Sequence, residues 1–199
     1  MTSHAPAGKE EQDAINWNNK GFALASLGQY EEALKAYDKA IELKPDFSVA
    51  WNNKAFSFSS LGRYEDALNA YDKAIELKPE NATTWNNKGS ILHVLGRYEG
   101  ALKAYEKAIE LKPDFSVAWN NKAVALDVLG RHEEALNAYD KAIELKPDYT
   151  KAWYGKGHAL FNLRQYGDAD KAFDKAIELT PDYNDALLGK RLVLDALKH

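Results

Sequence analysis

The feature that most constrains this chain is a 34-residue repeat that runs through most of its length. All five tryptophans follow this interval: Trp17, Trp51, Trp85, Trp119 and Trp153. The same period holds for five prolines, Pro45, Pro79, Pro113, Pro147 and Pro181, and for five alanines, Ala33, Ala67, Ala101, Ala135 and Ala169. Because three residue types keep one register over five copies, chance is excluded. A period of this length predicts a solenoid in which each unit stacks on its neighbours.

Each copy is numbered here from three residues before its tryptophan. This gives the repeats 14–47, 48–81, 82–115, 116–149 and 150–183. Residues 1–13 are then a tail and a lead-in to the first helix; residues 1–9 are expected to be disordered, with the helix beginning near Glu10 or Glu11. Residues 184–199 match the first half of a sixth copy and are expected to form a capping helix. Its charged face would shield the last repeat from water.

Within a repeat, apolar residues at helical spacing predict two helices. In the first copy the first stripe consists of Ala14, Trp17, Gly21 and Leu24, and the second of Ala33, Leu34, Tyr37, Ala40 and Ile41. Gly28 stands between them, where a left-handed residue commonly ends a helix. Pro45 ends the second helix because proline cannot continue the hydrogen-bond ladder. Neither helix has enough apolar surface to fold alone, so stacking must supply the core.

These spacings resemble the signature of the tetratricopeptide repeat family. The matching residues of the first copy are Trp17, Gly21, Leu24, Ala33, Tyr37, Ala40 and Pro45, and the resemblance covers residues 14–183. It implies an all-α fold of antiparallel helix pairs stacked into a right-handed superhelix, with the first helices lining a concave groove. The family consists mostly of peptide-binding and assembly modules, which implies a non-catalytic protein that binds an extended peptide. The alternative is a self-assembling scaffold that stacks through its repeat edges.

The resemblance places positions 2, 5, 6, 9, 12 and 13 of each repeat in the groove. The second and fourth copies differ at nine positions, and five of these fall at positions 9 to 13, as expected of a fixed scaffold with an adjustable surface. Position 6 carries Asn19, Asn53, Asn87 and Asn121, then Gly155; position 5 carries Asn18, Asn52, Asn86 and Asn120, then Tyr154. Because an amide both donates and accepts, a row of asparagines can pair with the backbone of an extended peptide. Alternatively, the amides are solvated or bonded within the chain.

Apolar residues flank these asparagines: Ile15, Val49 and Val117 at position 2, and Phe22, Phe56 and Val124 at position 9. A bare patch of this kind is characteristic of an interaction site, so the groove should favour a segment with alternating apolar side chains. Local specificity is expected from His93, Asp127, His158 and Phe161 at positions 9 and 12. Phe22 and Phe56 should be more exposed than Trp17 and Trp51. Relatives that bind chaperone tails use a carboxylate clamp, of which only Asn53 is present here, so such tails are disfavoured.

Two departures from the family pattern carry further expectations. Position 7 is lysine in every copy: Lys20, Lys54, Lys88, Lys122, Lys156 and, in the half copy, Lys190. The favoured interpretation is a lysine whose stem packs between repeats while its ammonium reaches a carboxylate or water. The alternative is a basic row that binds an acidic partner. Arg164 replaces the glycine that ends the first helix, so the fifth repeat is expected to turn differently.

Composition narrows the function classes. A net charge of −4 and a pI near 5.8 argue against general nucleic-acid binding, which needs a basic face. The chain has no apolar run long enough to span a membrane and no signal peptide, so a cytoplasmic protein is expected. It is expected to be a monomer or a weak homo-oligomer. Its five histidines show no metal-ligand spacing, and it has no phosphate-binding loop, so neither a metal, a cofactor nor an enzymatic activity is predicted.

Overall fold

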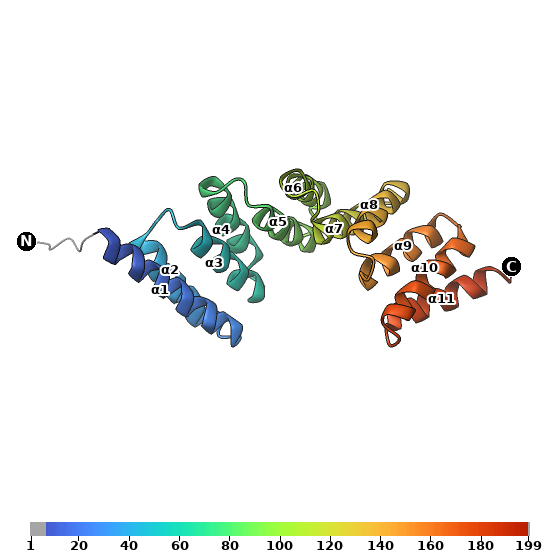
Figure 1. Ribbon diagram of the computed structural model, residues 1–199, viewed down its shortest axis with the longest axis horizontal. Coiled ribbons are helices and arrows are strands. Elements are labelled where there is room, and N and C mark those ends of the chain that lie inside the picture. Colours follow the sequence, from blue (N-terminus) through green and yellow to red (C-terminus); the bar gives the residue numbers. More distant parts are fainter. Residues whose placement is uncertain (1–6, 199) are drawn as a thin grey trace, which may run out of the picture. The chain divides into compact units, whose positions relative to one another are not determined.

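The computed structural model describes residues 7–198, and over that range the chain forms only α-helices and connecting turns (Figure 1). The helices are α1 (Ala7–Ser26), α2 (Tyr30–Leu43), α3 (Ser48–Ser60), α4 (Tyr64–Leu77), α5 (Ala82–Val94), α6 (Tyr98–Leu111), α7 (Ser116–Val128), α8 (His132–Leu145), α9 (Thr150–Asn162), α10 (Tyr166–Leu179) and α11 (Asn184–Ala196). Each repeat thus supplies two helices, and the half copy supplies α11. This confirms the all-α, repeat-based fold class.

The N-terminal boundary differs from the expectation. Residues 1–6 of the supposedly disordered tail lie outside the described residues, but residues 7–9 are helical, because α1 begins at Ala7 rather than near Glu10. The segment is rich in alanine, lysine, glutamate and glutamine, which favour helix even without packing. An ion pair between Glu11 and Lys44 also ties this first part of α1 to the end of α2.

The helices form two compact units, one ending at Leu95 and the other beginning at Gly96. In the first unit α1 to α5 pack in sequence, each on the next; in the second unit α6 to α11 do the same. First helices also contact each other across repeats, α1 with α3 in the first unit, and α7 with α9 and α9 with α11 in the second. Each unit therefore has a face built by its first helices.

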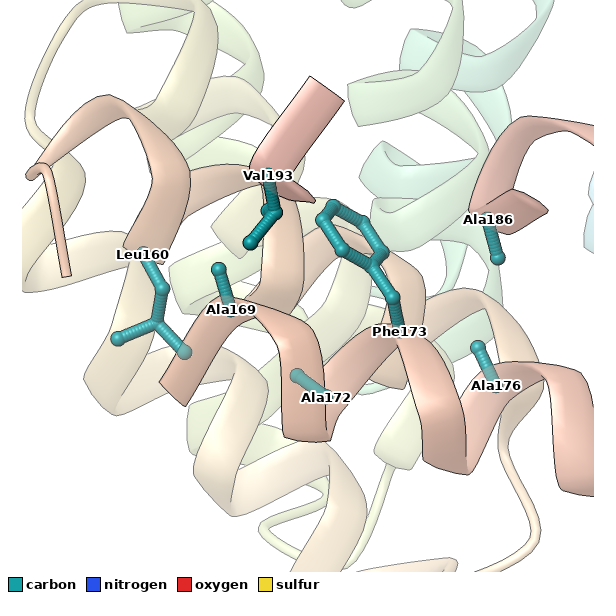
Figure 2. Packing of buried hydrophobic residues seen from close by; sticks show 7 residues of the cluster. All are labelled: Leu160, Ala169, Ala172, Phe173, Ala176, Ala186 and Val193. Atoms are coloured by element: carbon teal, nitrogen blue, oxygen red, sulfur yellow. The ribbon is translucent and has the colours of Figure 1, made fainter. Parts of the chain in front are cut away.

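Aromatic rings at position 24 form the centre of the packing between repeats. Tyr37, Tyr71, Tyr139 and Phe173 are almost fully buried. The Tyr37 ring lies so close to the backbone of Gly21 that a Cβ there would come within 2.6 Å of Cε1. In the last repeat Phe173 is enclosed in the same way by Gly157 and Gly189, and Figure 2 shows the ring between Val193 and Ala186 of α11. α11 therefore covers the core of the last helix pair.

A repeated hydrogen bond explains why tryptophan and proline share one period. The indole Nε1–H of Trp51 donates to the carbonyl oxygen of Pro45 at 3.0 Å. Equivalent bonds of 2.8, 2.9 and 2.9 Å join Trp85 to Pro79, Trp119 to Pro113 and Trp153 to Pro147. Each bond, worth about 1 kcal/mol, fixes the start of a first helix to the turn that precedes it. The tryptophans are accordingly half-buried, not fully buried.

From the second copy onward, the lysines at position 7 pair with acids at position 25 of the preceding repeat. Lys54 lies 2.6 Å from Asp38, Lys122 2.9 Å from Glu106 and Lys156 2.6 Å from Asp140. The same pairing joins Lys88 to Asp72 and Lys190 to Asp174. Five of the six position-7 lysines, all but Lys190, also place their ammonium group over the tryptophan ring of their own repeat, at 4.7 to 5.8 Å from its centre. The favoured interpretation, a lysine that packs between repeats, is confirmed.

The outer side of α11 is less polar than the sequence suggested. Lys190 pairs with Asp174 and Asp170 of the preceding helix, so it does not contribute to a charged outer face. The exposed residues of this helix include five leucines: Leu187, Leu188, Leu192, Leu194 and the C-cap Leu197. Leu187 and Leu194 stand at positions 4 and 11, where the other repeats have residues that pack against a second helix. These leucines are exposed because the half copy has no second helix among residues 7–198.

Arg164 takes the left-handed backbone conformation with φ 59°, like the glycines that end the other first helices, Gly28, Gly62, Gly96 and Gly130. Its N–H donates to Phe161 and that of Gln165 donates to Leu160, the same pattern that Gly28 and Gln29 make with Ala25 and Leu24. The expectation of a different turn is therefore wrong. The two hydrogen bonds hold the arginine in a conformation that L-residues seldom adopt.

Replacing Arg164 with glycine should raise the free energy of unfolding by about 0.5–1 kcal/mol, because the side chain's clash with its own backbone is removed. Urea denaturation followed by circular dichroism measures the change. The reciprocal variant Gly130→Ala has open space around its new methyl group, so its loss of about 1 kcal/mol would report the backbone conformation alone. Equal stability of Arg164→Gly and wild type would contradict strain at this turn.

Candidate binding groove

Residues at position 9 point outward from the face built by the first helices. Phe22 is 62% exposed and Phe56 51%, whereas Trp17 and Trp51 are half-buried, which confirms the predicted order of exposure. Position 4 turns toward the second helix of its repeat and position 9 turns away from it. Two phenylalanines are thus held in water by a packed scaffold, which is costly unless a ligand covers them.

In the first unit these phenylalanines border an open pocket of about 490 Å³. Residues of three successive first helices and of α2 line it: Phe22, Ala25, Ser26, Tyr30, Tyr37, Asn52, Asn53, Phe56 and Asn87. None of these side chains carries a charge at neutral pH. Burial raises the pKa of the Tyr37 hydroxyl to about 12, so this hydroxyl is uncharged at neutral pH. The pocket therefore offers apolar surface and neutral hydrogen-bonding groups.

The asparagines at position 6 lie on this face but are partly engaged within the chain. Asn19 is exposed, while Asn53, Asn87 and Asn121 are half-buried. The amide of Asn53 donates to Asn18 Oδ1 at 3.0 Å, and Asn87 hydrogen-bonds to the Tyr71 hydroxyl. The bond to Asn18 uses one of the two amide donors of Asn53. Internal bonding is therefore observed at Asn53, and pairing of this row with a peptide stays a prediction.

The asparagines at position 5 do not form a second exposed row. Asn18, Asn86 and Asn120 are only 7%, 6% and 5% exposed, and Asn52 is half-buried. These residues lie between first helices: Asn18 accepts from Asn53, and Asn52 Oδ1 accepts from the Thr84 hydroxyl at 3.1 Å. The prediction that they line the groove is therefore corrected: they bridge neighbouring repeats. Asn52 and Asn120 also form part of a pocket wall. Helical spacing alone cannot separate two neighbouring positions of this kind.

The remaining predicted groove residues fall into three groups. Val49 and Val117 at position 2 are exposed, and Ile15 and Val124 are half-buried. Phe161 packs instead against Tyr166 at 5.5 Å between ring centres and joins the core around Phe173. His93 is half-buried, and burial lowers its pKa, so its ring favours the neutral form. Phe161 therefore contributes to the fold.

A second pocket, of about 300 Å³, opens on the corresponding face of the second unit. Its wall is formed by Asn120, Val124, Asp127, Val128, Tyr139, Lys151, Tyr154, Gly155, His158 and Tyr183. The ring of Tyr154 lies edge-on to that of Tyr183, with 5.4 Å between their centres. This pocket joins apolar and aromatic surface to several titratable groups, unlike the uncharged pocket of the first unit.

One carboxylate in this pocket joins three helices. Asp127 of α7 accepts from Nδ1 of His132 on α8 at 2.6 Å and from Nδ1 of His158 on α9 at 2.7 Å. Burial alone would raise the pKa of Asp127, but the two imidazole hydrogen bonds outweigh burial and hold the pKa below its usual value. The hydrogen bond to Asp127 likewise raises the pKa of His158. The sequence indicated Asp127 and His158 separately, but not His132 or their contact.

Gly155 interrupts the row of asparagines for a steric reason. A Cβ at this position would lie 2.3 Å from Cζ and 2.6 Å from the hydroxyl of Tyr139. The fully buried ring thus occupies the space that a side chain at position 6 would need. The close approach of ring and backbone therefore accounts for glycine in place of asparagine at position 6 of the fifth repeat.

Over residues 7–198, no group of three histidine, cysteine, aspartate or glutamate side chains is placed to hold a metal ion. Within the same range no helix combines the length and apolar character needed to cross a membrane.

Sequence profiles of the tetratricopeptide repeat match the chain at residues 14–47, 116–149 and 150–183, at 53–116 and at 36–69. No curated protein shows significant sequence similarity to it. Among solved structures, YrrB, a TPR protein described as having an unusual peptide-binding site, is 29% identical, with a TM-score of 0.76 over 92% of this chain and 93% of YrrB. MamA is 25% identical, with a TM-score of 0.75 over 80% and 93%. PilF of Pseudomonas aeruginosa, 21% identical, shares the fold with a TM-score of 0.85 over 96% and 86%.

The steric account of Gly155 leads to a stability prediction. Gly155→Asn, which restores the asparagine row, should lower the free energy of unfolding by about 2–3 kcal/mol because the new side chain displaces the Tyr139 ring. Chemical denaturation measures the loss. Gly167→Ala serves as the control, since no atom lies within 4 Å of its new methyl group and it should be neutral or slightly stabilising. A Gly155→Asn protein as stable as wild type would show that the ring can move aside.

Proposed function

The chain belongs to the tetratricopeptide repeat family, and on that premise we propose that it binds an extended segment of a partner protein along the face built by its first helices. Members of this family are generally protein–protein interaction modules. The observation that carries the proposal is the pair of exposed phenylalanines beside the 490 Å³ pocket of the first unit. A ligand on this face would cover apolar surface that the packed scaffold holds in water.

The chemistry of the first pocket indicates which segment would fit. Phe22 and Phe56 offer apolar and aromatic surface, and the amides of Asn52 and Asn53 stand beside them. An extended peptide presents apolar side chains at alternate residues and an N–H and a C=O at each one, so it can satisfy both kinds of surface. The peptide-binding site ascribed to YrrB agrees with this use of the fold.

The proposed role is binding without catalysis. The chain has no cysteine, and the group formed by Asp127 and its two histidine partners is held together by internal hydrogen bonds. The proposed partner is therefore a protein or peptide, bound reversibly.

The exposed leucines of α11 favour a second candidate function, self-assembly through the C-terminal edge. Leu187 and Leu194 stand where a second helix packs in the complete repeats, so the edge can accept a helix from another copy. Light scattering across a range of concentrations tests this. A mass that rises with concentration and returns to that of a monomer in Leu187→Ser/Leu194→Ser would support assembly; a constant monomer mass would refute it.

The peptide proposal predicts a strong effect of Phe22→Ala/Phe56→Ala on binding. Because aromatic side chains often dominate interfaces, the double variant should lose about tenfold or more in affinity. Its free energy of unfolding should stay within about 0.5 kcal/mol of wild type, because both rings are exposed. The measurement is recovery of partners from native lysate, followed by titration of a segment of the recovered partner.

The control is Leu43→Ala, which removes an exposed leucine from α2, outside the pocket. Partners retained by Leu43→Ala and lost by Phe22→Ala/Phe56→Ala would support the groove. Asn53→Ala/Asn87→Ala/Asn121→Ala, checked for equal helicity, then separates the roles of the asparagines: lost binding indicates backbone pairing, and unchanged binding indicates internal bonding. Partners that bind the phenylalanine variant as tightly as wild type would place the interface elsewhere.

A further inference from the structure

The first-helix face of the fifth repeat carries a different chemistry from that of the second. Positions 2, 5 and 9 are Val49, Asn52 and Phe56 in the second repeat and Lys151, Tyr154 and His158 in the fifth. Residues three and seven apart share one face of a helix, so each set forms a continuous strip. The second repeat's Asn52 and Phe56 line the uncharged pocket, and all three fifth-repeat residues line the second one. The fold is the same, but a strip of uncharged side chains is replaced by a tyrosine between two basic residues.

The structure fixes which side of the histidine ring is available. Nδ1 of His158 lies 2.7 Å from Asp127 and 3.3 Å from the amide of Asn162. Only Nε2 remains as a ring nitrogen that can meet a ligand, and the side chain is 51% exposed. Asp127 is 9% exposed and is itself held by His132, so the carboxylate orients the ring as a fixed partner. His158 therefore presents Nε2 to the pocket in a set orientation.

The charges around the pocket favour an anionic ligand when His158 is protonated. The hydrogen bond from His158 to Asp127 raises the His158 pKa, so the protonated ring is favoured more than in a free imidazole. Lys151 on α9 adds a second positive charge, and the one carboxylate in the pocket wall, Asp127, is already engaged by two imidazoles. Burial, and then the negative charge of Asp185 on α11, raise the pKa of Tyr154 and Tyr183. The same Asp185 charge opposes the binding of an anion. Tyr139 on α8 stays neutral because burial raises its pKa.

We propose that the second unit's pocket recognises an aspartate or glutamate side chain within the bound segment, through His158 Nε2–H and Lys151, and that this recognition strengthens as His158 takes up a proton. The inference rests on the proposed function, since the acidic side chain belongs to the segment that occupies the first-helix face. Val124 and Val128 would contact the apolar part of the same segment. The second unit's pocket would thus recognise a segment by charge as well as by apolar contact.

The test uses the full chain and a phage-displayed library of random dodecapeptides fused through their C-termini, so that no free C-terminal carboxylate is present. Selections are made near pH 6 and near pH 8, on either side of ordinary histidine titration. Parallel selections use Lys151→Val/His158→Phe, which installs the residues that the second repeat tolerates at the same positions, and His158→Gln. Circular dichroism first confirms that the variants keep the helical content and melting behaviour of wild type.

Selection on wild type should enrich aspartate or glutamate near pH 6 and less near pH 8. A selected peptide should bind about fivefold more tightly at the lower pH, while its Glu→Gln or Asp→Asn analogue should show no such change. Both variants should still select peptides but without acidic enrichment or the pH effect. Acidic enrichment that persists in His158→Gln, or peptides with no acidic preference in wild type, would overturn this inference and leave the proposed function standing. If wild type selects no peptide at either pH, both proposals fail.

Discussion

The close seating of an aromatic ring against the backbone of neighbouring first helices is the constraint on which the rest of this structure depends. Tyr37 meets Gly21, Tyr139 meets Gly155, and Phe173 lies between Gly157 and Gly189, in each case with no room for a Cβ. Such contacts bring the helices that make them nearer than ordinary side chains allow. The hydrogen bonds from tryptophan to proline carbonyls then hold the beginning of the helix to the preceding turn.

Because packing against its neighbours sets the orientation of a first helix, the exposed positions follow from that packing. Position 4 turns toward the second helix, position 5 toward the neighbouring repeat, and position 9 toward water. A side chain at position 9 contributes little to the core and can vary without loss of stability. Phe56 and His158 occupy this place in the second and fifth repeats and reach different pockets. A solenoid of nearly identical frames can therefore present different chemistry along its face.

The two pockets differ most in how their charge depends on pH. The first is lined by uncharged side chains, so its affinity for an apolar segment would depend little on pH. The second contains a carboxylate shared by two imidazoles and lies beside Lys151, so its charge changes as His158 titrates. The hydrogen bonds of Asp127 join α7, α8 and α9, and the same contacts that stabilise the packing also orient His158.

The sequence by itself determined the repeat, the two helices in each copy, the turns that contain glycine and the exposure of Phe22 and Phe56, because these depend on periodicity and local backbone preference. It also indicated correctly that the position-7 lysines pack between repeats. Only the tertiary structure decided that Asn18, Asn86 and Asn120 are buried, that Phe161 joins the core and that Gly155 yields to Tyr139. It alone brought Asp127 between His132 and His158. These outcomes depend on which atoms meet between helices. A rotation of a helix about its axis by less than the angle between adjacent residues decides whether a side chain faces a neighbouring helix or solvent.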